Sequence, residues 1–268
     1  MKGLQLSQIH NDFSVPKVSI ITVAFNSAAT IRDTIQSVLL QDYPSIEYIV
    51  IDGGSTDGTI EIIEEYRDCI SKFISEPDHG IYDAMNKGIK AATGDVVCMI
   101  NSDDFYATGS AIKHLVHRMI NNGSDTVFAD LVIVDPSDTN RILRYYDSSL
   151  FHPKRLRYGW MPAHPTFLAK RRLYERWGGY SLDYQIAADF EMMVRLLYKA
   201  RASYAYLPEI IVKMRAGGVS TNGLRNSLIL NNEIVSACKL NGLDTSLFRV
   251  MLKLPRKLME YWKRPRGF

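Results

Sequence analysis

The chain has 268 residues, of which 46% are hydrophobic and 23% charged, and its formal net charge is +3. These values exclude a disordered or fibrous protein and predict an ordinary globular fold with a sizeable core. The three cysteines lack the spacing of a zinc site or a disulfide framework, which fits a reducing cytoplasm. Residues 1–16 do not resemble a secretory signal, and no run of about 20 apolar residues predicts a membrane span.

The first elements in chain order predict a strand, a helix and a second strand. Residues 18–25 and 48–51 are apolar runs of strand length, typical of parallel strands that are buried on both faces. Between them, residues 29–41 repeat apolar side chains at helical spacing. Residues 52–59 then form a glycine-rich turn into another helix, and such a turn favours the approach of an anionic ligand.

A third helix over residues 82–92 precedes a strand over residues 96–100 that ends in acidic residues. Its last residues lead into Asn101, Ser102, Asp103 and Asp104. This alternation predicts a doubly wound α/β sheet whose ligands bind at the carboxyl edge of the strands, where Asp52 also lies. Further along, we expect a helix at 112–119, strands of a more mixed sheet at 126–130 and 142–146, and helices at 189–197 and 222–240.

Four motifs in this order resemble the family 2 glycosyltransferases of the GT-A fold. They are the first strand with Thr22 and Asn26, the turn over residues 52–59, the segment 84–88, and the acidic segment 101–104. Residues 76–86 and 217–221 further resemble bacterial enzymes that build colanic-acid-type exopolysaccharides and glycolipids. The resemblance covers residues 17 to about 220. We therefore expect an N-terminal extension over 1–16, a catalytic domain over 17–221 and a basic helical extension over 222–268.

The resemblance implies that one group of side chains binds a nucleotide-sugar donor. Thr22 and Asp52 are expected to line the base and ribose, with Asp52 accepting a hydrogen bond from a base N–H of uracil or guanine. A turn-forming role for Asp52 is the structural alternative. The donor residues that the resemblance implies are Thr22, Asn26, Asp52, Asp83, Asp103 and His164, with Asp78 and His79 along the same cleft.

The acidic segment corresponds to the family's DXD-type motif. The resemblance implies that Asp104 binds Mg²⁺ or Mn²⁺ and that Asp103 helps to hold the ribose. Asn101 departs from the pattern, since many relatives have an aspartate there, and its amide oxygen adds no charge. The metal is needed because a departing nucleoside diphosphate develops negative charge in the transition state.

The family's general base is an acid near the start of a helix that follows the acceptor loop, and Asp189 matches it. Glu191 is the competing candidate, and helix capping is the structural alternative for Asp189. His164 corresponds to a position near the donor phosphates, although a histidine beside prolines is also an ordinary turn residue. Arg215, together with Gly217 and Gly218, is a further candidate for closing over the diphosphate.

The C-terminal tail concentrates positive charge. Residues 249–268 carry a net charge of +6, so the rest of the chain carries −3. Residues 246–258 place leucines and Met251 on one side and basic residues on the other, which predicts a segment that binds an anionic membrane surface. A solvated helix and a contact between two copies of the chain are the alternatives, and Pro255 is expected to bend the segment.

These features predict an inverting, metal-dependent glycosyltransferase that uses a UDP- or GDP-sugar. Its expected acceptor is a lipid-linked oligosaccharide or another glycan, and its expected location is the cytoplasmic face of the cell membrane. A sugar nucleotidyltransferase lacks support because no glycine-rich, basic phosphate loop opens the chain. A nucleotide-sugar sensor is the non-catalytic alternative. A nucleic-acid partner is not expected, because the acidic motifs would repel a phosphate backbone.

Overall fold

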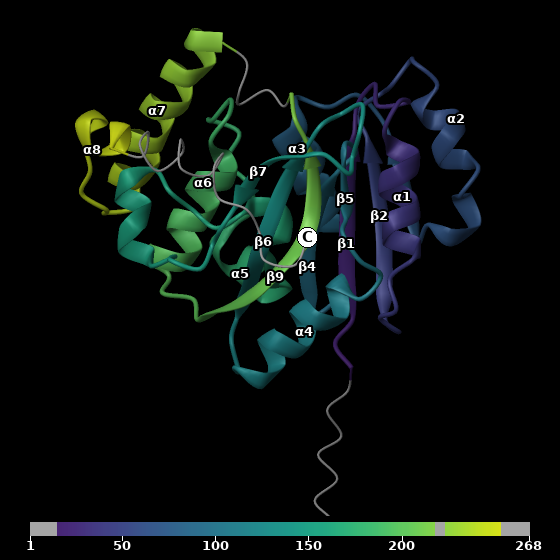
Figure 1. Ribbon diagram of the computed structural model, residues 1–268, viewed down its shortest axis with the longest axis horizontal. Helices are drawn as coiled ribbons and strands as arrows, with labels where there is room; N and C mark the ends of the chain where they lie inside the picture. Colours follow the sequence, from purple (N-terminus) through teal and green to yellow (C-terminus); the bar gives the residue numbers. More distant parts are fainter. Residues whose placement is uncertain (1–14, 218–222, 253–268) are drawn as a thin grey trace, which may run out of the picture.

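The computed structural model describes residues 15–217 and 223–252. The described residues form one nine-stranded mixed sheet with helices on both faces (Figure 1). Eight strands follow the order β3-β2-β1-β4-β8-β6-β9-β5, and β7 pairs with β6. The strands are β1 (Val18–Ala24), β2 (Ile46–Asp52), β3 (Lys72–Ser75), β4 (Val96–Asn101), β5 (Asp104–Tyr106), β6 (Thr126–Val134), β7 (Ile142–Tyr146), β8 (Leu168–Lys170) and β9 (Tyr204–Arg215).

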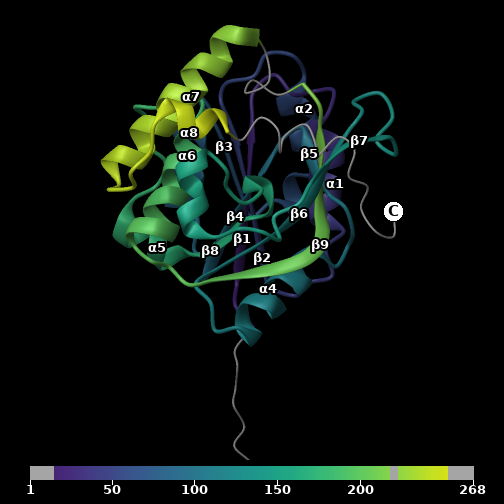
Figure 2. The same cartoon turned by 60° about the vertical axis from the view of Figure 1, so that its left-hand side comes forward.

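The helices divide into two layers because both faces of the sheet are apolar. Side chains of α1, α2 and α4 join one buried cluster, and those of α3, α5, α6 and α7 join the other. Figure 2 shows the sheet between these layers. The helices are α1 (Ile31–Leu39), α2 (Thr59–Glu64), α3 (Ile81–Ala91), α4 (Ala111–Asn121), α5 (Arg171–Trp177), α6 (Ala188–Met193), α7 (Gly223–Leu240) and α8 (Leu247–Met251). Shorter turns are η1 (Arg67–Cys69), η2 (Pro153–Tyr158), η3 (His164–Thr166) and the π-helical η4 (Val194–Lys199).

The parallel half of the sheet confirms the expected doubly wound arrangement. β1 pairs in parallel with β2 and β4, in a register that places Ala24 beside Asp52 and Val23 beside Asn101. α3 lies close against β1, because a Cβ on Gly88 would come within 2.3 Å of Ile21 Cγ2. The carboxyl ends of β1, β2 and β4 therefore form one edge, which we call the carboxyl edge.

The mixed half of the sheet contains strands that the sequence pattern did not predict. β9 is twelve residues long, yet Pro208 and Glu209 interrupt its pairing with β6 and shift the register between Ala129 and Leu131. A proline inside a strand removes a ladder hydrogen bond, so this segment does not look like a central strand in the sequence. β3, β5 and β8 are only three or four residues long and leave no periodic signal.

Two expectations concern residues that lie outside the described part of the chain. Residues 1–14, 218–222 and 253–268 are not described, so the Gly218–Thr221 part of one motif and the bend at Pro255 are not tested. Among the described residues, no helix combines the length and hydropathy that crossing a membrane requires.

Candidate active site

Asp104 is an acidic residue that the fold buries without a partner. It does not simply follow β4, as the sequence suggested, but begins β5, which pairs with β9. Its backbone oxygen accepts a 2.7 Å hydrogen bond from Thr34 Oγ1, while its side chain is turned to the interior. Only 1% of the residue is exposed, and neither carboxylate oxygen has a hydrogen-bond partner among the described residues.

The electrostatics of Asp104 and its neighbours fit a cation. Burial raises the pKa of Asp104 well above its usual range, and the charge of Asp103 raises it further, against an opposing effect of Arg215. Burial also raises the pKa of Asp103. The amide oxygen of Asn101 at the end of β4 is likewise buried without a partner. The unpaired oxygens of the Asp104 carboxylate and the Asn101 amide are of the kind that Mg²⁺ or Mn²⁺ takes as ligands.

No group of three or more His, Cys, Asp or Glu side chains with metal-binding geometry is present in the described part of the chain. A Mg²⁺ site commonly uses only one or two carboxylates and completes its shell with substrate phosphates and water. The side-chain oxygens of Asp104 and Asn101 at the carboxyl edge could hold a divalent ion.

The carboxylate of Asp52 is already engaged in the turn that follows β2. It accepts hydrogen bonds from the backbone N–H groups of Gly54 and Ser55, both at 3.0 Å, and from the hydroxyls of Ser55 and Ser75. These contacts are those of a residue that stabilises a turn, which was the structural alternative for Asp52. Asp78 lies at the same strand end, because a Cβ on Gly53 would be 2.4 Å from its Oδ2.

Thr22 lies away from the carboxyl edge. It is fully buried in the middle of β1, and its hydroxyl accepts a 3.1 Å hydrogen bond from Tyr48 in the layer under α1. The expected contact with base or ribose is therefore not available in this structure, because side chains alternate between the two faces of a strand. Asn26, by contrast, lies just beyond the strand with a left-handed φ of 47°, and its Oδ1 accepts from the Thr56 N–H.

The start of α3 carries further polar side chains beside the carboxyl edge. Asp83 accepts a 3.1 Å hydrogen bond from the His79 N–H, and Asp78 accepts one from the Gly80 N–H. Lys87 Nζ lies 2.9 Å from Glu76 and 3.7 Å from Asp83. These contacts order the segment before α3, so Asp83 has a structural role besides its expected place in the donor cleft.

His164 and Asp189 come together with two tyrosines on the other half of the molecule. His164 Nε2 is 2.8 Å from the Tyr180 hydroxyl, and the Tyr180 ring stacks on Tyr82 at 5.8 Å. Burial raises the pKa of Asp189, against an opposing effect of His164. Burial lowers the pKa of His164, partly offset by Asp189. A carboxyl group with a raised pKa beside a neutral imidazole suits proton transfer.

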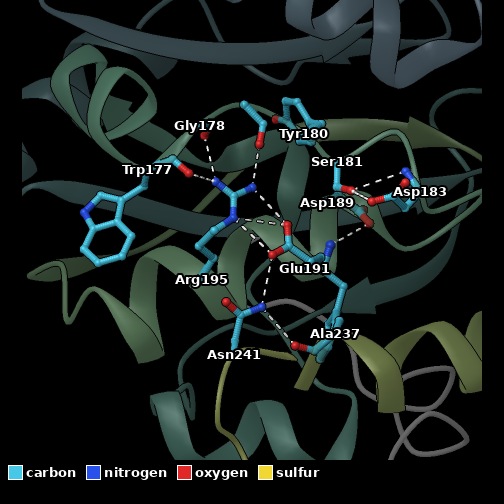
Figure 3. Close-up of polar contacts among 12 residues, drawn as sticks. Trp177, Gly178, Tyr180, Ser181, Asp183, Asp189, Glu191, Arg195, Ala237 and Asn241 are labelled. Atoms are coloured by element: carbon cyan, nitrogen blue, oxygen red, sulfur yellow. Dashed lines mark hydrogen bonds and ion pairs between the residues drawn. The ribbon is translucent and has the colours of Figure 1, made fainter. Parts of the chain in front are cut away.

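The structure distinguishes Asp189 from its alternatives. Asp189 lies in the first turn of α6 rather than at the N-cap, which is Ala187. Its Oδ1 accepts a 2.7 Å hydrogen bond from the Phe190 N–H, so Asp189 also has a structural contact at the start of this helix. Glu191 is 7% exposed, forms an ion pair with Arg195 and accepts a 3.0 Å hydrogen bond from Asn241 (Figure 3). Since Arg195 also donates to the carbonyls of residues 177–179, Glu191 holds a structural network and is not free to act as a base.

Two residues that position the loop before Asp189 were not predicted from the sequence. Asn86 exchanges two 2.8 Å hydrogen bonds with the backbone of Tyr180 and so connects α3 to the loop before α6. Glu233 of α7 accepts from the consecutive N–H groups of residues 185, 186 and 187 at 2.7 to 3.0 Å. Asn86 belongs to a recognised motif, whereas nothing local in the sequence marks Glu233.

Arg215 is held at the end of β9 rather than in an open loop. Its guanidinium pairs with Asp33, donates to the Asp103 carbonyl at 2.8 Å and lies 4.8 Å from the centre of the Phe105 ring. Only 8% of its side chain is exposed. Arg215 therefore supports the segment that carries Asp103 and Asp104, and a direct contact with a diphosphate would require it to leave these partners.

Three similar proteins relate this chain to glycosyltransferases. An uncharacterized glycosyltransferase of Mycobacterium tuberculosis is 33% identical over 183 residues, which are 68% of this chain and 69% of that protein. WfaP of Escherichia coli, a UDP-Glc:alpha-D-GlcNAc-diphosphoundecaprenol beta-1,3-glucosyltransferase, is 27% identical over 226 residues, 82% of this chain and 86% of WfaP. The solved mannosyltransferase PcManGT of Pyrobaculum calidifontis, in complex with GDP-Man and Mn²⁺, superimposes with a TM-score of 0.65 at 20% identity, covering 92% of this chain and 73% of PcManGT.

These similarities confirm the predicted GT-A fold and the resemblance to bacterial polysaccharide and glycolipid enzymes. The structural similarity by itself concerns the fold, since the identity is only 20%. The family model for glycosyl transferase family 2 matches residues 19–179, which include the first strand, the turn after Asp52 and the acidic segment. The chain therefore belongs to glycosyl transferase family 2.

Proposed function

We propose that this protein is an inverting, metal-dependent glycosyltransferase. It transfers one sugar from a nucleoside-diphosphate donor to a lipid-linked or other glycan acceptor, at the cytoplasmic face of the membrane. The observation that carries the proposal is the buried, unpartnered carboxylate of Asp104 beside the unpartnered Asn101 oxygen at the carboxyl edge. A buried charge without a partner is costly, so its presence in a family 2 enzyme favours a bound cation.

The donor class is supported by the similar proteins. WfaP is named for UDP-Glc and PcManGT was solved with GDP-Man, so both bases remain candidates for this chain. A Mg²⁺ or Mn²⁺ ion held by Asp104, with Asp103 and Asn101 beside it, would supply positive charge where the diphosphate departs. The named acceptor of WfaP carries a diphosphoundecaprenol group, which supports a lipid-linked acceptor here.

Asp189 is the proposed base of the transfer. Its carboxylate takes the proton of an acceptor hydroxyl while that oxygen forms a bond to the anomeric carbon and the bond to the nucleoside diphosphate breaks. A single displacement of this kind inverts the configuration, since no enzyme nucleophile intervenes. His164 and Tyr180 are hydrogen-bonded to each other and supply polar groups beside the Asp189 carboxylate.

The first prediction separates the two acidic sites. A panel of UDP- and GDP-sugars with Mn²⁺ is screened for hydrolysis and thermal stabilisation, and the best donor is then tested with Asp189→Asn and Asp104→Ala. We expect Asp189→Asn to lose at least 100-fold in turnover while its donor affinity is kept, because a general base contributes about 10²- to 10⁴-fold. We expect Asp104→Ala to lose Mn²⁺-dependent donor binding.

The matched control is Asp68→Asn, which changes an exposed carboxylate on η1. Full activity of Asp189→Asn would overturn the assignment of the base. Donor binding without any turnover by the wild-type protein, with acceptors supplied, would instead favour a nucleotide-sugar sensor.

A further inference from the structure

A cavity of about 730 Å³ lies at the opposite end of β9 from Arg215 and the acidic segment. Its lining includes His152 and Lys154 of the η2 region, Lys199 at the end of η4, Arg201, and Asn241 after α7. None of the described residues that line it is acidic. We call it the basic cavity.

The cations of the basic cavity have no charge partners within the described part of the chain. Lys154, Lys199 and Arg201 are exposed, and none of them forms an ion pair with another described residue. Arg249 on the neighbouring α8, by contrast, pairs with Asp244. Because the chain outside its tail carries a net charge of −3, three unpaired cations around one cavity are a local concentration of positive charge that suits an anion.

Arg201 occupies an unfavourable backbone conformation at this cavity. Its φ is +54°, a left-handed value that glycine adopts without strain, and the N–H of Ala202 closes the end of η4 on the carbonyl of Leu196 at 3.0 Å. Glycine or asparagine is the usual residue at such a helix end. The chain instead has an arginine at this position, which favours a role for its positive charge in binding a ligand.

An exposed apolar surface adjoins the basic cavity. The contact is made by η2, which contributes Pro153 and Lys154 to the cavity lining and packs against α8. α8 packs against η2 and α7 at the outer edge of the molecule (Figure 1), and it exposes large apolar side chains. We call this set the apolar rim: Leu247 (46% exposed), Phe248 (76%), Met251 (42%) and Leu252 (52%).

We propose that the basic cavity and the apolar rim together bind the surface of an anionic lipid bilayer, with a lipid phosphate in the cavity. Exposed aromatic and aliphatic side chains enter the interface between headgroups and acyl chains, and neighbouring cations are attracted to anionic headgroups. This combination distinguishes a bilayer from a soluble phosphate, which needs the cations but not the apolar rim.

The position of this surface agrees with a membrane-anchored acceptor, a point that rests on the proposed function. Lys199 lies ten residues after Asp189 along the continuous α6–η4 helix, which corresponds to roughly 15 Å. The carboxyl edge is farther away from the cavity. Arg215, which supports the acidic segment, is separated from the cavity by eleven residues of β9, roughly 35 Å of strand. A bilayer at this surface would present a lipid-linked glycan to the side of the molecule that holds Asp189.

The test is flotation of the full-length protein with vesicles of phosphatidylcholine alone or mixed with phosphatidylglycerol. Because the tail is present in every sample, differences report on the described surface. We expect Lys154→Ala/Lys199→Ala to weaken binding to the anionic vesicles about 25-fold, at about fivefold for each cation removed. Phe248→Ser should also weaken it at least fivefold. The matched control is Arg67→Ala/Lys90→Ala, which removes cations of η1 and α3 that do not line the cavity.

Arg201→Gly separates binding from folding. Glycine relieves the left-handed strain, so this variant should melt at a temperature equal to or above that of the wild type while binding anionic vesicles more weakly. Unchanged flotation of the double variant and of Phe248→Ser would overturn the proposal. Thermal stabilisation by inorganic phosphate that Arg201→Gly abolishes, with unchanged flotation, would assign the cavity to a soluble anion and also overturn it. Neither readout depends on transferase activity, so failure here leaves the proposed reaction untouched.

Discussion

At the scale of single residues, Asp104 is placed where it could bind a ligand, and this placement lowers the stability of the free protein. Its two carboxylate oxygens are buried without partners, while its backbone is held by Thr34 and by the pairing of β5 with β9. Leaving a buried polar group unsatisfied costs about 1 to 3 kcal/mol, and more for a charged one. The rigid backbone keeps the side chain in place, and the favourable effect of Arg215 does not offset the cost of its burial.

The second prediction follows from this cost. In EDTA at neutral pH, Asp104→Asn should be as stable as the wild type or more stable, by up to about 3 kcal/mol, because the amide avoids the cost of ionising a buried carboxyl group. For a chain of this size that corresponds to a rise in Tm of about 2 to 4 °C per kcal/mol. Thermal unfolding with and without Mn²⁺ measures it, and the variant should also lose any stabilisation by Mn²⁺. A variant less stable than the wild type in EDTA would contradict the account.

Glu47 illustrates the opposite case, a buried carboxylate with a full set of partners. Burial raises the pKa of Glu47, but hydrogen bonds from Ser19 and Thr93 and the charge of Lys17 outweigh it and lower the pKa to about 2. Because the folded pKa lies below the ordinary value of 4.5, ionised Glu47 stabilises the fold above about pH 4.5. That contribution is lost as the pH falls from about 4.5 towards 2.

The third prediction uses this pH window. Glu47→Gln should reduce the free energy of unfolding by about 2 to 3 kcal/mol at pH 7, and the difference should narrow below pH 4.5. Denaturant unfolding at pH 7 and pH 3 measures both values. Glu64→Gln, which changes an exposed residue of α2, is the control and should alter neither. An equal loss for Glu47→Gln at both pH values would show that its charge is not the cause.

At the scale of elements, the loop before α6 is held by α7. The N-cap residue Ala187 has no side chain that can accept a hydrogen bond, and Glu233 from α7 accepts from three successive N–H groups instead. The carboxylate thus satisfies N–H groups of the loop that leads into α6. The loop that precedes Asp189 is therefore held by a residue 44 positions further along the chain.

The fourth prediction concerns this contact. Glu233→Ala should lower kcat about tenfold while the KM for the donor stays unchanged, because the loop before Asp189 loses its anchor but the carboxyl edge is not altered. Steady-state kinetics with the donor found above measures both constants. Glu233→Gln keeps one carbonyl oxygen as an acceptor and should recover part of the rate. A change confined to donor KM would contradict the proposed positioning role.

At the scale of the whole molecule, the C-terminal helices belong to the same core as the catalytic sheet. Ile234, Ala237 and Cys238 of α7 and Val250 of α8 are buried in the cluster that also contains α3, α5 and α6. A Cβ on Gly159 would lie 3.2 to 3.3 Å from Val250 and Ile234. The boundary expected between residues 221 and 222 therefore does not coincide with a gap in the packing.

The fifth prediction tests this shared core. Ile234→Ala should destabilise the whole chain by about 2 to 4 kcal/mol in a single unfolding transition, because it opens a cavity in the common cluster. Leu228→Ala on the same helix is the control, since Leu228 is 63% exposed. Calorimetry distinguishes one transition from two. Separate unfolding of α7 and α8, with an unchanged transition for the rest, would support an independent C-terminal unit.

The sequence by itself determined the parallel half of the molecule and the family. Continuous apolar runs, helical periodicity and turn glycines act over a few residues, so β1, α1, β2, α3 and β4 could be predicted, and so could the place of Asp52, Asp103 and Asp104 at one edge. The family motifs are local in the same way, and the match over residues 19–179 bears them out.

Only the tertiary structure decided which of these residues are free to bind. Thr22 is enclosed by Tyr48, Asp52 and Glu191 are engaged with neighbours, and Asp104 is left without a partner. Such differences come from contacts between segments that are far apart in the chain, as between Glu233 and residues 185–187 or between Arg215 and Asp103. Local sequence patterns do not record them, because burial and hydrogen bonding of a side chain depend on what the folded chain brings to it.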